Sequence, residues 1–287
     1  MPLDISVHKT ILFQLLQDIY SHNEIAPFLG FKGGTAALLF YKLDRFSVDI
    51  DLDLLDESKE DKVFEEIATI AKKYGTLKES YKKRFNLFFL LSYEDKAHNI
   101  KIEINRRQFG SRYEIKTYLG VSMQVMTPED MFAHKLMAMY ERIDRTSRDI
   151  YDVWFFLSNR FPINKNIIEN RSSMSFRQLT NECIQKLEKL NNIHILEGLG
   201  ELLATNQKDW AKAKLKKETI SLLKLRIESE NLKQQGEEIR GSLRSEDYKG
   251  VDVSEIARAF GGGGHKLAAG FKFKGKIEKT QEGWKIT

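Results

Sequence analysis

Cysteine is almost absent from this sequence, since Cys183 is the only one. A single thiol can form neither an intramolecular disulfide nor a thiolate metal cluster, so both kinds of site are excluded within one chain. Proteins that fold without disulfides are typical of reducing compartments. We therefore expect a cytoplasmic protein.

Long apolar runs are absent as well. No stretch approaches the roughly 18 apolar residues that mark a membrane-spanning helix. The segment "ILFQLLQDIY" at 11–20 is interrupted by Gln14, Gln17 and Asp18, and the N-terminus does not resemble a signal peptide. These absences predict a soluble protein without a membrane partner.

The composition that remains is that of a folded enzyme or binding protein. The chain has 287 residues, of which 41% are hydrophobic, enough for one large domain or two medium ones with real cores. Its formal net charge is +5. A modest positive charge fits a nucleic-acid or nucleotide partner, although many basic proteins bind neither.

An acidic strand is the first sign of chemistry. In "RFSVDIDLDLL" (45–55), Asp49, Asp51 and Asp53 alternate with apolar residues, which predicts a half-buried strand at 46–55 with three carboxylates on one face. Carboxylates roughly 7 Å apart repel one another unless a cation lies between them. The alternative is a surface hairpin whose acids face water.

A second segment repeats this pattern. At 99–107, isoleucines point one way, while Lys101, Glu103 and Asn105 point the other. Glu103 is therefore expected to join Asp49 and Asp51 as a metal ligand, with Asp53 a bystander. Divalent cations gripped by three carboxylates suit phosphoryl or nucleotidyl transfer, and we expect Mg²⁺ or Mn²⁺.

A glycine turn precedes the acidic strand. Gly33 and Gly34 lie between a short apolar strand and a predicted helix that Thr35 can cap. Glycines at a helix start let backbone N–H groups approach an anion. A glycine pair alone indicates only a turn, but together with the acidic strand it predicts a triphosphate cradle facing a metal site.

Two helical segments add charged residues. Thr127 and Pro128 are a typical helix start, and within that helix Lys135 and Arg142 share a face. A second helix is predicted over 146–158, with two acids, Asp149 and Asp152, on one of its faces. The basic pair could neutralise phosphates and an aspartate could act as a base, or these could be ordinary surface ion pairs.

The chain divides into three parts. Residues 1–126 contain the predicted helices 4–21 and 57–74 and the strands 84–93, 99–107 and 118–126, and form the expected catalytic core. Residues 127–240 are mostly helical and complete the expected site. Composition changes after Gly241, so residues 241–287 form a separate C-terminal fragment.

The blocks "KGGTAALLFYKLDRFSVDIDLDLL" and "TPEDMFAHKLMAMYERIDRTSRDIYDVWFF" resemble the AbiEii toxin family of nucleotidyltransferases, over roughly residues 5–235. This family belongs to the DNA-polymerase-β-like superfamily and includes toxins of bacterial abortive-infection toxin–antitoxin pairs. The resemblance implies an α+β fold. A polymerase-β-like core with a mixed sheet and helices would be followed by a helical region and a small α/β C-terminal fragment.

The same resemblance implies roles for individual residues. In the family, a glycine turn and a D-x-D pair bind nucleotide and metal, and here these are Gly33, Gly34, Asp49 and Asp51. Lys135 would contact the triphosphate, and Asp152, an aspartate of the last block, would complete the catalytic set. Glu103 joins that set on its strand pattern and not on the resemblance. The other expected nucleotide-binding residues are Thr35, Arg45, Ser47 and Arg142.

The tail resembles a different family. "SLRSEDYKGVDVSEIARAFGGGGHKLAAGFKF" (242–273) is similar to the end of the DHH-associated domain of phosphoesterases. In those enzymes a G-G-G-H loop helps hold a nucleic acid or nucleotide. The corresponding residues are Gly262, Gly263, Gly264 and His265, with Arg244 as a second candidate. The fragment could add nucleic-acid affinity or have a structural role only.

Three functions remain open from the sequence. The first is a Mg²⁺-dependent nucleotidyltransferase that moves a nucleoside monophosphate from an NTP to an acceptor. The resemblance implies that it is the toxin of a toxin–antitoxin pair, with a cognate antitoxin as partner. RNA, especially a tRNA 3′ end, is the favoured acceptor. The second is a non-catalytic nucleic-acid-binding protein with a degenerate transferase fold. The third is a phosphoesterase, although the chain has no D-H-H block.

Overall fold

The computed structural model describes residues 5–93, 98–230, 238–244, 252–259, 261–274, 277–280 and 283–286. The chain forms two compact units, Met1–Leu222 and Leu223–Thr287. Within the described residues, no helix combines the length and the apolarity needed to cross a bilayer.

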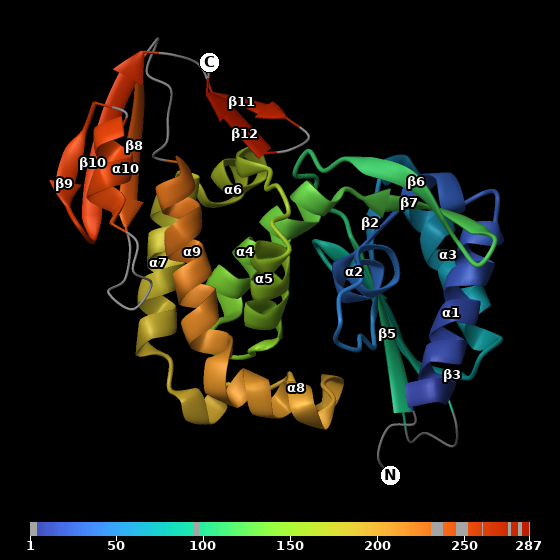
Figure 1. Ribbon diagram of the computed structural model, residues 1–287. Coiled ribbons are helices and arrows are strands. Elements are labelled where there is room, and N and C mark those ends of the chain that lie inside the picture. The colour runs from blue at the N-terminus through green and yellow to red at the C-terminus, as the bar shows by residue number, and fades with distance from the viewer. Residues whose placement is uncertain are drawn as a thin grey trace. The chain divides into compact units, whose positions relative to one another are not determined.

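The first unit is built on one seven-stranded sheet, in the order β3-β4-β5-β2-β1-β7-β6 (Figure 1). Its strands are β1 (Leu29–Lys32), β2 (Ile50–Leu54), β3 (Thr76–Lys82), β4 (Asn86–Tyr93), β5 (His98–Asn105), β6 (Tyr113–Tyr118) and β7 (Val121–Met126). The pairs β1–β7 and β2–β5 are parallel, and the other neighbours are antiparallel. This mixed sheet, combined with many helices, confirms the expected α+β class.

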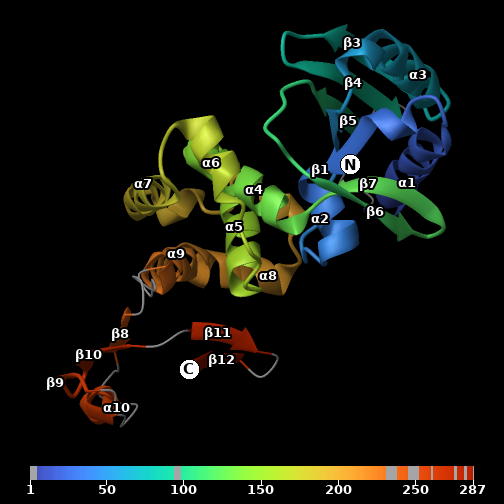
Figure 2. The ribbon, with the colours of Figure 1, turned by 90° about the horizontal axis from the view of Figure 1, so that it is seen from above.

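Side-chain alternation gives the sheet an apolar face and a polar face. Ile50, Leu52, Ile102 and Ile104 are fully buried, and helices α1 (Ile5–Ser21), α2 (Gly33–Tyr41) and α3 (Glu60–Lys72) supply the rest of this core. Figures 1 and 2 both show α1 and α3 side by side along the sheet. Because neighbours in a strand point to opposite sides, the charged residues of β2 and β5 project from the other face.

Two edge strands were not predicted. β3 is almost entirely exposed and β6 is largely so, and neither shows a regular alternation of buried apolar residues. The segment 118–126, predicted as one strand, instead contains the end of β6, a turn and β7. That turn has positive φ angles at Leu119 (46°) and Gly120 (83°). Edge strands bury little apolar surface, so hydrophobic periodicity identifies them poorly.

The helical region follows the sheet. It contains α4 (Pro128–Arg142), α5 (Arg148–Ser158), α6 (Lys165–Ser172), α7 (Phe176–Lys189), α8 (Thr205–Trp210), a π-helical turn (Ala211–Leu215) and α9 (Lys216–Glu230). Pro128 occupies the first turn of α4, as predicted. Phe132 of α4 stacks on Phe156 of α5, with ring centroids 5.4 Å apart. Figure 2 shows α4 beside α2, so α4 brings its polar residues to the sheet.

The second unit is small. It contains β8 (Glu238–Arg244), α10 (Val253–Ala259), β9 (Gly263–His265), β10 (Ala268–Lys274), β11 (Ile277–Thr280) and β12 (Gly283–Ile286). β10 is the centre of a three-stranded antiparallel sheet, while β11 and β12 form a hairpin. Val253 and Ala257 of α10 pack on Ala269 of β10, which gives this α/β fragment a core of its own.

Candidate active site

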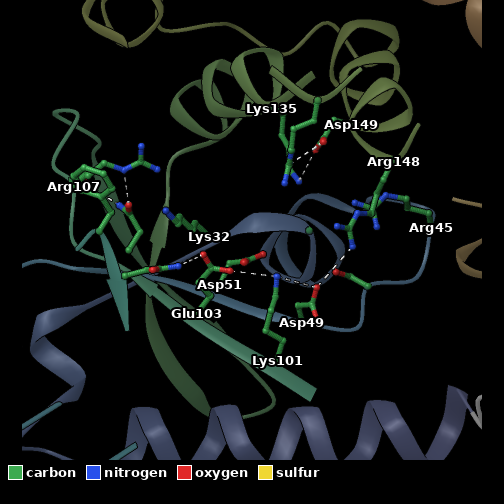
Figure 3. A pocket seen from close by; sticks show the side chains of 16 residues that line it. Lys32, Arg45, Asp49, Asp51, Lys101, Glu103, Arg107, Lys135, Arg148 and Asp149 are labelled. Atoms are coloured by element: carbon green, nitrogen blue, oxygen red, sulfur yellow. Dashed lines mark hydrogen bonds and ion pairs between the residues drawn. The ribbon is translucent and has the colours of Figure 1, made fainter. Parts of the chain in front are cut away.

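A cavity of about 390 Å³ opens on the polar face of the sheet (Figure 3). Acidic residues enter it from β2 and β5, and basic residues enter it from α4 and α5. Figure 3 shows Lys135 and Asp149 facing Asp49 and Asp51 from the opposite wall. The lining residues are Lys32, Gly34, Arg45, Ser47, Asp49, Asp51, Phe85, Asn86, Lys101, Glu103, Asn105, Arg107, Lys135, Arg142, Arg148 and Asp149.

Three carboxylates share one wall of the cavity. Asp51 lies in β2 directly opposite Glu103 of β5, in parallel register. Asp49 precedes β2, which begins at Ile50 and is shorter than the predicted strand 46–55. The Lys101 ammonium lies 3.7 Å from Asp49 Oδ2 and 3.3 Å from Glu103 Oε2. A cation is therefore favoured among these acids.

The charge on Asp49 is costly in the folded protein. Burial raises its pKa above the ordinary aspartate value; Asp51 and Glu103 raise it further, and Lys101 and Arg148 oppose them. Burial lowers the pKa of Lys101, but the three acids outweigh it and the net shift is upward. Asp49 is thus a carboxylate whose ionised form needs a further positive charge nearby.

Asp49→Asn is expected to leave the melting temperature at pH 7.5 unchanged or to raise it, because it removes a destabilising buried charge. A raised folded-state pKa contributes stability below the ordinary aspartate pKa, and that contribution is lost as pH rises through the folded-state pKa. Any gain of the variant should therefore shrink as pH falls toward about 4. Thermal melts across that range test this, and a clearly lower melting temperature at pH 7.5 contradicts it.

Asp53 of β2 has a different environment from Asp49 and Asp51. Lys32 Nζ, Asn105 Nδ2 and the Tyr113 hydroxyl each donate a hydrogen bond to its carboxylate at 2.6 Å. A Cβ on Gly30 would lie 2.3 Å from the Tyr113 ring, so the ring packs directly on that glycine. Asp53 therefore holds neighbouring strands together and has little capacity left for a ligand.

The glycine turn fits closely against the acids. Gly33 has φ +78°, and a Cβ there would lie 2.2 Å from Asp51 Oδ2, so only glycine suits the position. A Cβ on Gly34 would lie 2.7 Å from Ser47 Oγ. Helix α2 begins at Gly33 with Lys32 as N-cap and without a capping side chain. Its first N–H groups are thus placed for an anion beside Asp51.

Thr35 does not cap α2, so this prediction was wrong. It lies inside the helix, donates a hydrogen bond to the backbone carbonyl of Asp49, and lies 3.0 Å from Ser47 Oγ. The N-cap, Lys32, lies three residues earlier than expected, because glycine permits the positive φ at the first helical position, Gly33. Thr35 and Ser47 tie α2 to the segment that carries Asp49.

A buried ion-pair network lies behind the cavity wall. Arg45 and Asp152 are 1% and 0% exposed and form two parallel hydrogen bonds of 2.6 and 2.7 Å. Lys135 Nζ lies 2.7 Å from Asp152 Oδ2. Burial alone would raise the pKa of Asp152, but Arg45 and Lys135 outweigh it and hold that pKa well below its ordinary value.

This environment does not suit the expected role of Asp152 in deprotonation. Its two oxygens are already engaged by cations, and its side chain does not line the cavity. Asp152 instead connects Arg45, which precedes β2, with Lys135 on α4. We assign it to the positioning of Lys135.

Asp149 is also buried, at 1% exposed, so it is not part of a surface ion pair. Arg142 Nη2 lies 2.8 Å from its Oδ2 and Lys135 Nζ lies 3.9 Å from its Oδ1. Arg148 extends to the opposite wall, 3.7 Å from Asp49 Oδ2. The basic residues of α4 and α5 are thus gathered around the cavity.

Several lining residues were missed by the sequence analysis. Lys101 alternates with Glu103 on a strand whose polar face was recognised, so a signal for it was present. Lys32 directly precedes the glycine turn and offered a weaker signal. Phe85 and Arg107 fall within the predicted strands 84–93 and 99–107, but β4 begins at Asn86 and β5 ends at Asn105, so both residues lie just outside the observed strands. His134 is half-buried between Ser111 and Arg171, and desolvation lowers its pKa to about 3.

The donor set of the acidic wall fits a hard divalent cation. Carboxylate oxygens are the ligands that Mg²⁺ prefers, and it commonly takes one or two of them together with substrate phosphates. Within the described ranges, no group of three or more His, Cys, Asp or Glu side chains is set to hold a metal ion. A site made by Asp49, Asp51 and the substrate is therefore a better match than a cage of protein ligands.

The C-terminal loop has structural reasons for two of its glycines. A Cβ on Gly262 would lie 2.1 Å from the Gly270 carbonyl oxygen, and Gly264 has φ +151° with the Ala268 oxygen 2.5 Å from its Cβ position. Gly263 faces open space, and His265 is exposed. Arg244 is also exposed, at the end of β8. The loop is thus shaped by packing and still presents polar groups.

Comparison with known proteins gives two family matches. Residues 14–219 match the nucleotidyl transferase AbiEii toxin of Type IV toxin–antitoxin systems, and residues 209–283 match the DHHA1 domain. No curated protein matches the chain.

Among solved structures, a candidate nucleotidyltransferase from H. pylori is 15% identical, with a TM-score of 0.54 over 82% of this chain and 100% of that chain. JHP933 from Helicobacter pylori is 16% identical, with a TM-score of 0.47 over 80% and 98%. At this identity, the first likeness shows a shared fold.

Proposed function

Since the chain belongs to the AbiEii family of nucleotidyltransferase toxins, we propose that it transfers a nucleoside monophosphate from an NTP to the 3′ end of an RNA, with Mg²⁺ as cofactor. The observation that carries this proposal is the cavity in which Asp49, Asp51 and Glu103 face Lys135 and Arg142. A non-catalytic binding protein would have no use for half-buried carboxylates that repel one another.

The triphosphate is expected on the side of α2 and α4. Gly33 lies against Asp51 and Gly34 lies against Ser47 and Arg45. The N–H groups of this helix start suit the β and γ phosphates. Lys135 is held by the buried Asp152, so its ammonium is positioned before the substrate arrives. Arg142 is about half exposed and can turn from Asp149 toward a phosphate.

The acids act on the acceptor side. Mg²⁺ held by Asp49 and Asp51 would neutralise charge on the reacting phosphate. The 3′ hydroxyl attacks the α-phosphorus in line, the bond to the β-phosphate oxygen breaks, and pyrophosphate leaves. Glu103 takes the hydroxyl proton in this scheme, since Asn86 Nδ2 donates to its carboxylate and orients it.

An antitoxin protein is the second partner that the family match suggests. Cytoplasmic RNA is the target in this proposal because the chain carries a net charge of +5 and basic residues surround the cavity.

The C-terminal unit is proposed to add affinity for nucleic acid, as its match to the DHHA1 domain suggests. Arg244→Ala and His265→Ala, both at exposed positions, should each raise the KM for RNA by roughly two- to five-fold with kcat unchanged. Gly262→Ala should disrupt the loop instead, because its methyl group meets backbone atoms. Steady-state kinetics test this, and unchanged KM values in both exposed variants would leave the unit a structural role only.

A label-transfer assay tests the proposed function. The protein is incubated with Mg²⁺, each α-labelled NTP in turn, and tRNA or total RNA. Label on RNA supports the proposal and identifies the nucleotide. Label on protein keeps the chemistry but changes the acceptor, and no label with RNA still bound in a gel shift favours the binding protein.

A further inference from the structure

Arginine and aromatic side chains alternate in a row, two members of which, Phe85 and Arg107, line the cavity. Arg84 and Arg107 lie 5.0 and 5.2 Å from the Phe85 ring centroid. Arg107 and Arg171 lie 5.4 and 4.8 Å from the Phe109 ring centroid. We call these five residues the basic-aromatic row. Figure 3 shows Arg107 at the opposite end of the cavity from Arg148.

Phe85 is the most exposed ring of this row. It lies in the turn between β3 and β4, is 46% exposed, and lines the cavity together with Arg107. A single exposed apolar side chain needs no explanation. Here, however, the ring is flanked by two guanidinium groups and lies near Glu103, and such a combination is typical of surfaces that stack nucleobases.

The turn that carries Phe85 is held in place. Arg106 N–H donates to the Phe85 carbonyl at 2.8 Å, and Lys83 N–H donates to the Asn86 carbonyl at 2.8 Å. The Arg106 guanidinium also donates to the carbonyl of Lys83 at 3.2 Å and forms an ion pair with Glu60. The ring is therefore positioned before any ligand binds, which reduces the entropy lost on binding.

The order of strands places this row on the acceptor side. Gly33 and Gly34 follow β1, on one side of the acidic strand β2, while β5 and then β4 lie on the other side. In-line displacement requires the hydroxyl to approach from the side opposite the leaving pyrophosphate. If the phosphates bind at the start of α2, the acceptor enters the cavity from the side of Glu103 and Asn86. Phe85 lines the cavity on that side.

We propose that Phe85 and Arg107 form a stacking platform for the unpaired 3′-terminal nucleotides of the RNA acceptor. This inference rests on the proposed function. Unstacked bases bind to aromatic rings and arginine planes with little dependence on sequence. The platform would therefore select for a single-stranded 3′ end and not for a particular base.

Binding of a labelled RNA hairpin tests the platform directly. One hairpin ends in a single-stranded 3′ tail and the other is blunt, and fluorescence anisotropy gives both Kd values without NTP or metal. Phe85→Ala should raise the Kd for the tailed hairpin by roughly ten-fold, with little effect on the blunt one. Phe85→Trp should retain binding. Arg107→Lys should weaken it although the charge is kept, because the planar group is lost.

Matched controls are available on exposed positions outside the row. Ile193→Ala removes an apolar side chain that is 82% exposed, and Arg177→Gln removes an exposed arginine of α7. Both should leave the Kd unchanged. Equal melting temperatures of all variants exclude a folding defect.

The results also separate the platform from the reaction. An unchanged Kd for Phe85→Ala, or equal losses for tailed and blunt RNA, would overturn the platform. A higher KM for NTP with unchanged RNA binding would overturn it too, because the ring would then hold the nucleotide base. If the wild type transfers no label yet Phe85→Ala selectively weakens tailed RNA, the transferase proposal fails and the platform stands.

Discussion

Asp51→Asn is expected to lower kcat for nucleotidyl transfer by roughly 10³-fold or more, since metal stabilisation of a phosphoryl transition state is worth several kcal/mol. Asp51 is central to the acidic wall. It pairs with Glu103 in register and lies against Gly33, which has no room for a side chain. Asparagine has nearly the same shape, so the fold should be kept. Rates of label transfer, with melting curves beside them, measure the effect.

A matched control is Asp61→Asn, since the Asp61 side chain is 87% exposed in an ion pair with Lys82 away from the cavity. This control should transfer label at the wild-type rate. Full activity of Asp51→Asn would remove Asp51 from the metal site. If Asp61→Asn were inactive as well, the loss in Asp51→Asn could not be assigned to the metal site.

Among the substitutions proposed here, Asp152→Asn should cause the largest decrease in the free energy of unfolding. Removing one partner of a buried ion pair leaves the other charge unpaired, which costs about 3–5 kcal/mol. Here two cations, Arg45 and Lys135, lose their partner. For a unit of this size the melting temperature should fall by about 6–20 °C. Activity should fall as well, because Lys135 loses its positioning contact. Thermal melts measure the loss of stability, and KM and kcat measure the loss of activity.

The difference in stability between wild type and Asp152→Asn should change with pH in a defined direction. The pKa of Asp152 is lowered in the folded protein, so its stabilising contribution is present above the ordinary aspartate pKa and is lost as pH falls through the lowered value. The gap between wild type and Asp152→Asn should thus be widest at neutral pH and narrow in acid. The double variant Arg45→Met/Asp152→Leu should recover part of the loss. If Asp152→Asn were as stable as the wild type at neutral pH, the stabilising role of the buried ion-pair network would be contradicted.

The core of the site was accessible from local patterns. Strand alternation identified the polar face that carries Asp51 and Glu103, and the glycine pair marked the turn before α2. Both signals depend on residues close in sequence, and backbone geometry transmits them directly to the structure. Helical spacing likewise identified the face of α4 that presents Lys135 and Arg142.

Long-range contacts accounted for the errors. Thr35 was expected to cap α2, but it bonds instead to the segment before β2. An aspartate of α5 was considered as a base, but Arg45, far away in the sequence, occupies the carboxylate of Asp152. Local sequence patterns do not predict which buried charges form ion pairs. The pairing of Arg45 with Asp152 depends on how α5 packs against the segment before β2.

The sequence by itself therefore determined which residue types alternate on each strand and helix, and so the acids, the glycine turn and the basic helix face. Only the tertiary structure decided which of these face the cavity, which are buried in ion pairs, and which loop residues join them. Phe85 and Arg107 illustrate the difference: each falls within a predicted strand, but the two are far apart along the chain and meet only because β4 and β5 pair. Periodicity is a property of neighbouring residues, whereas a binding surface is made by strands and helices that fold together.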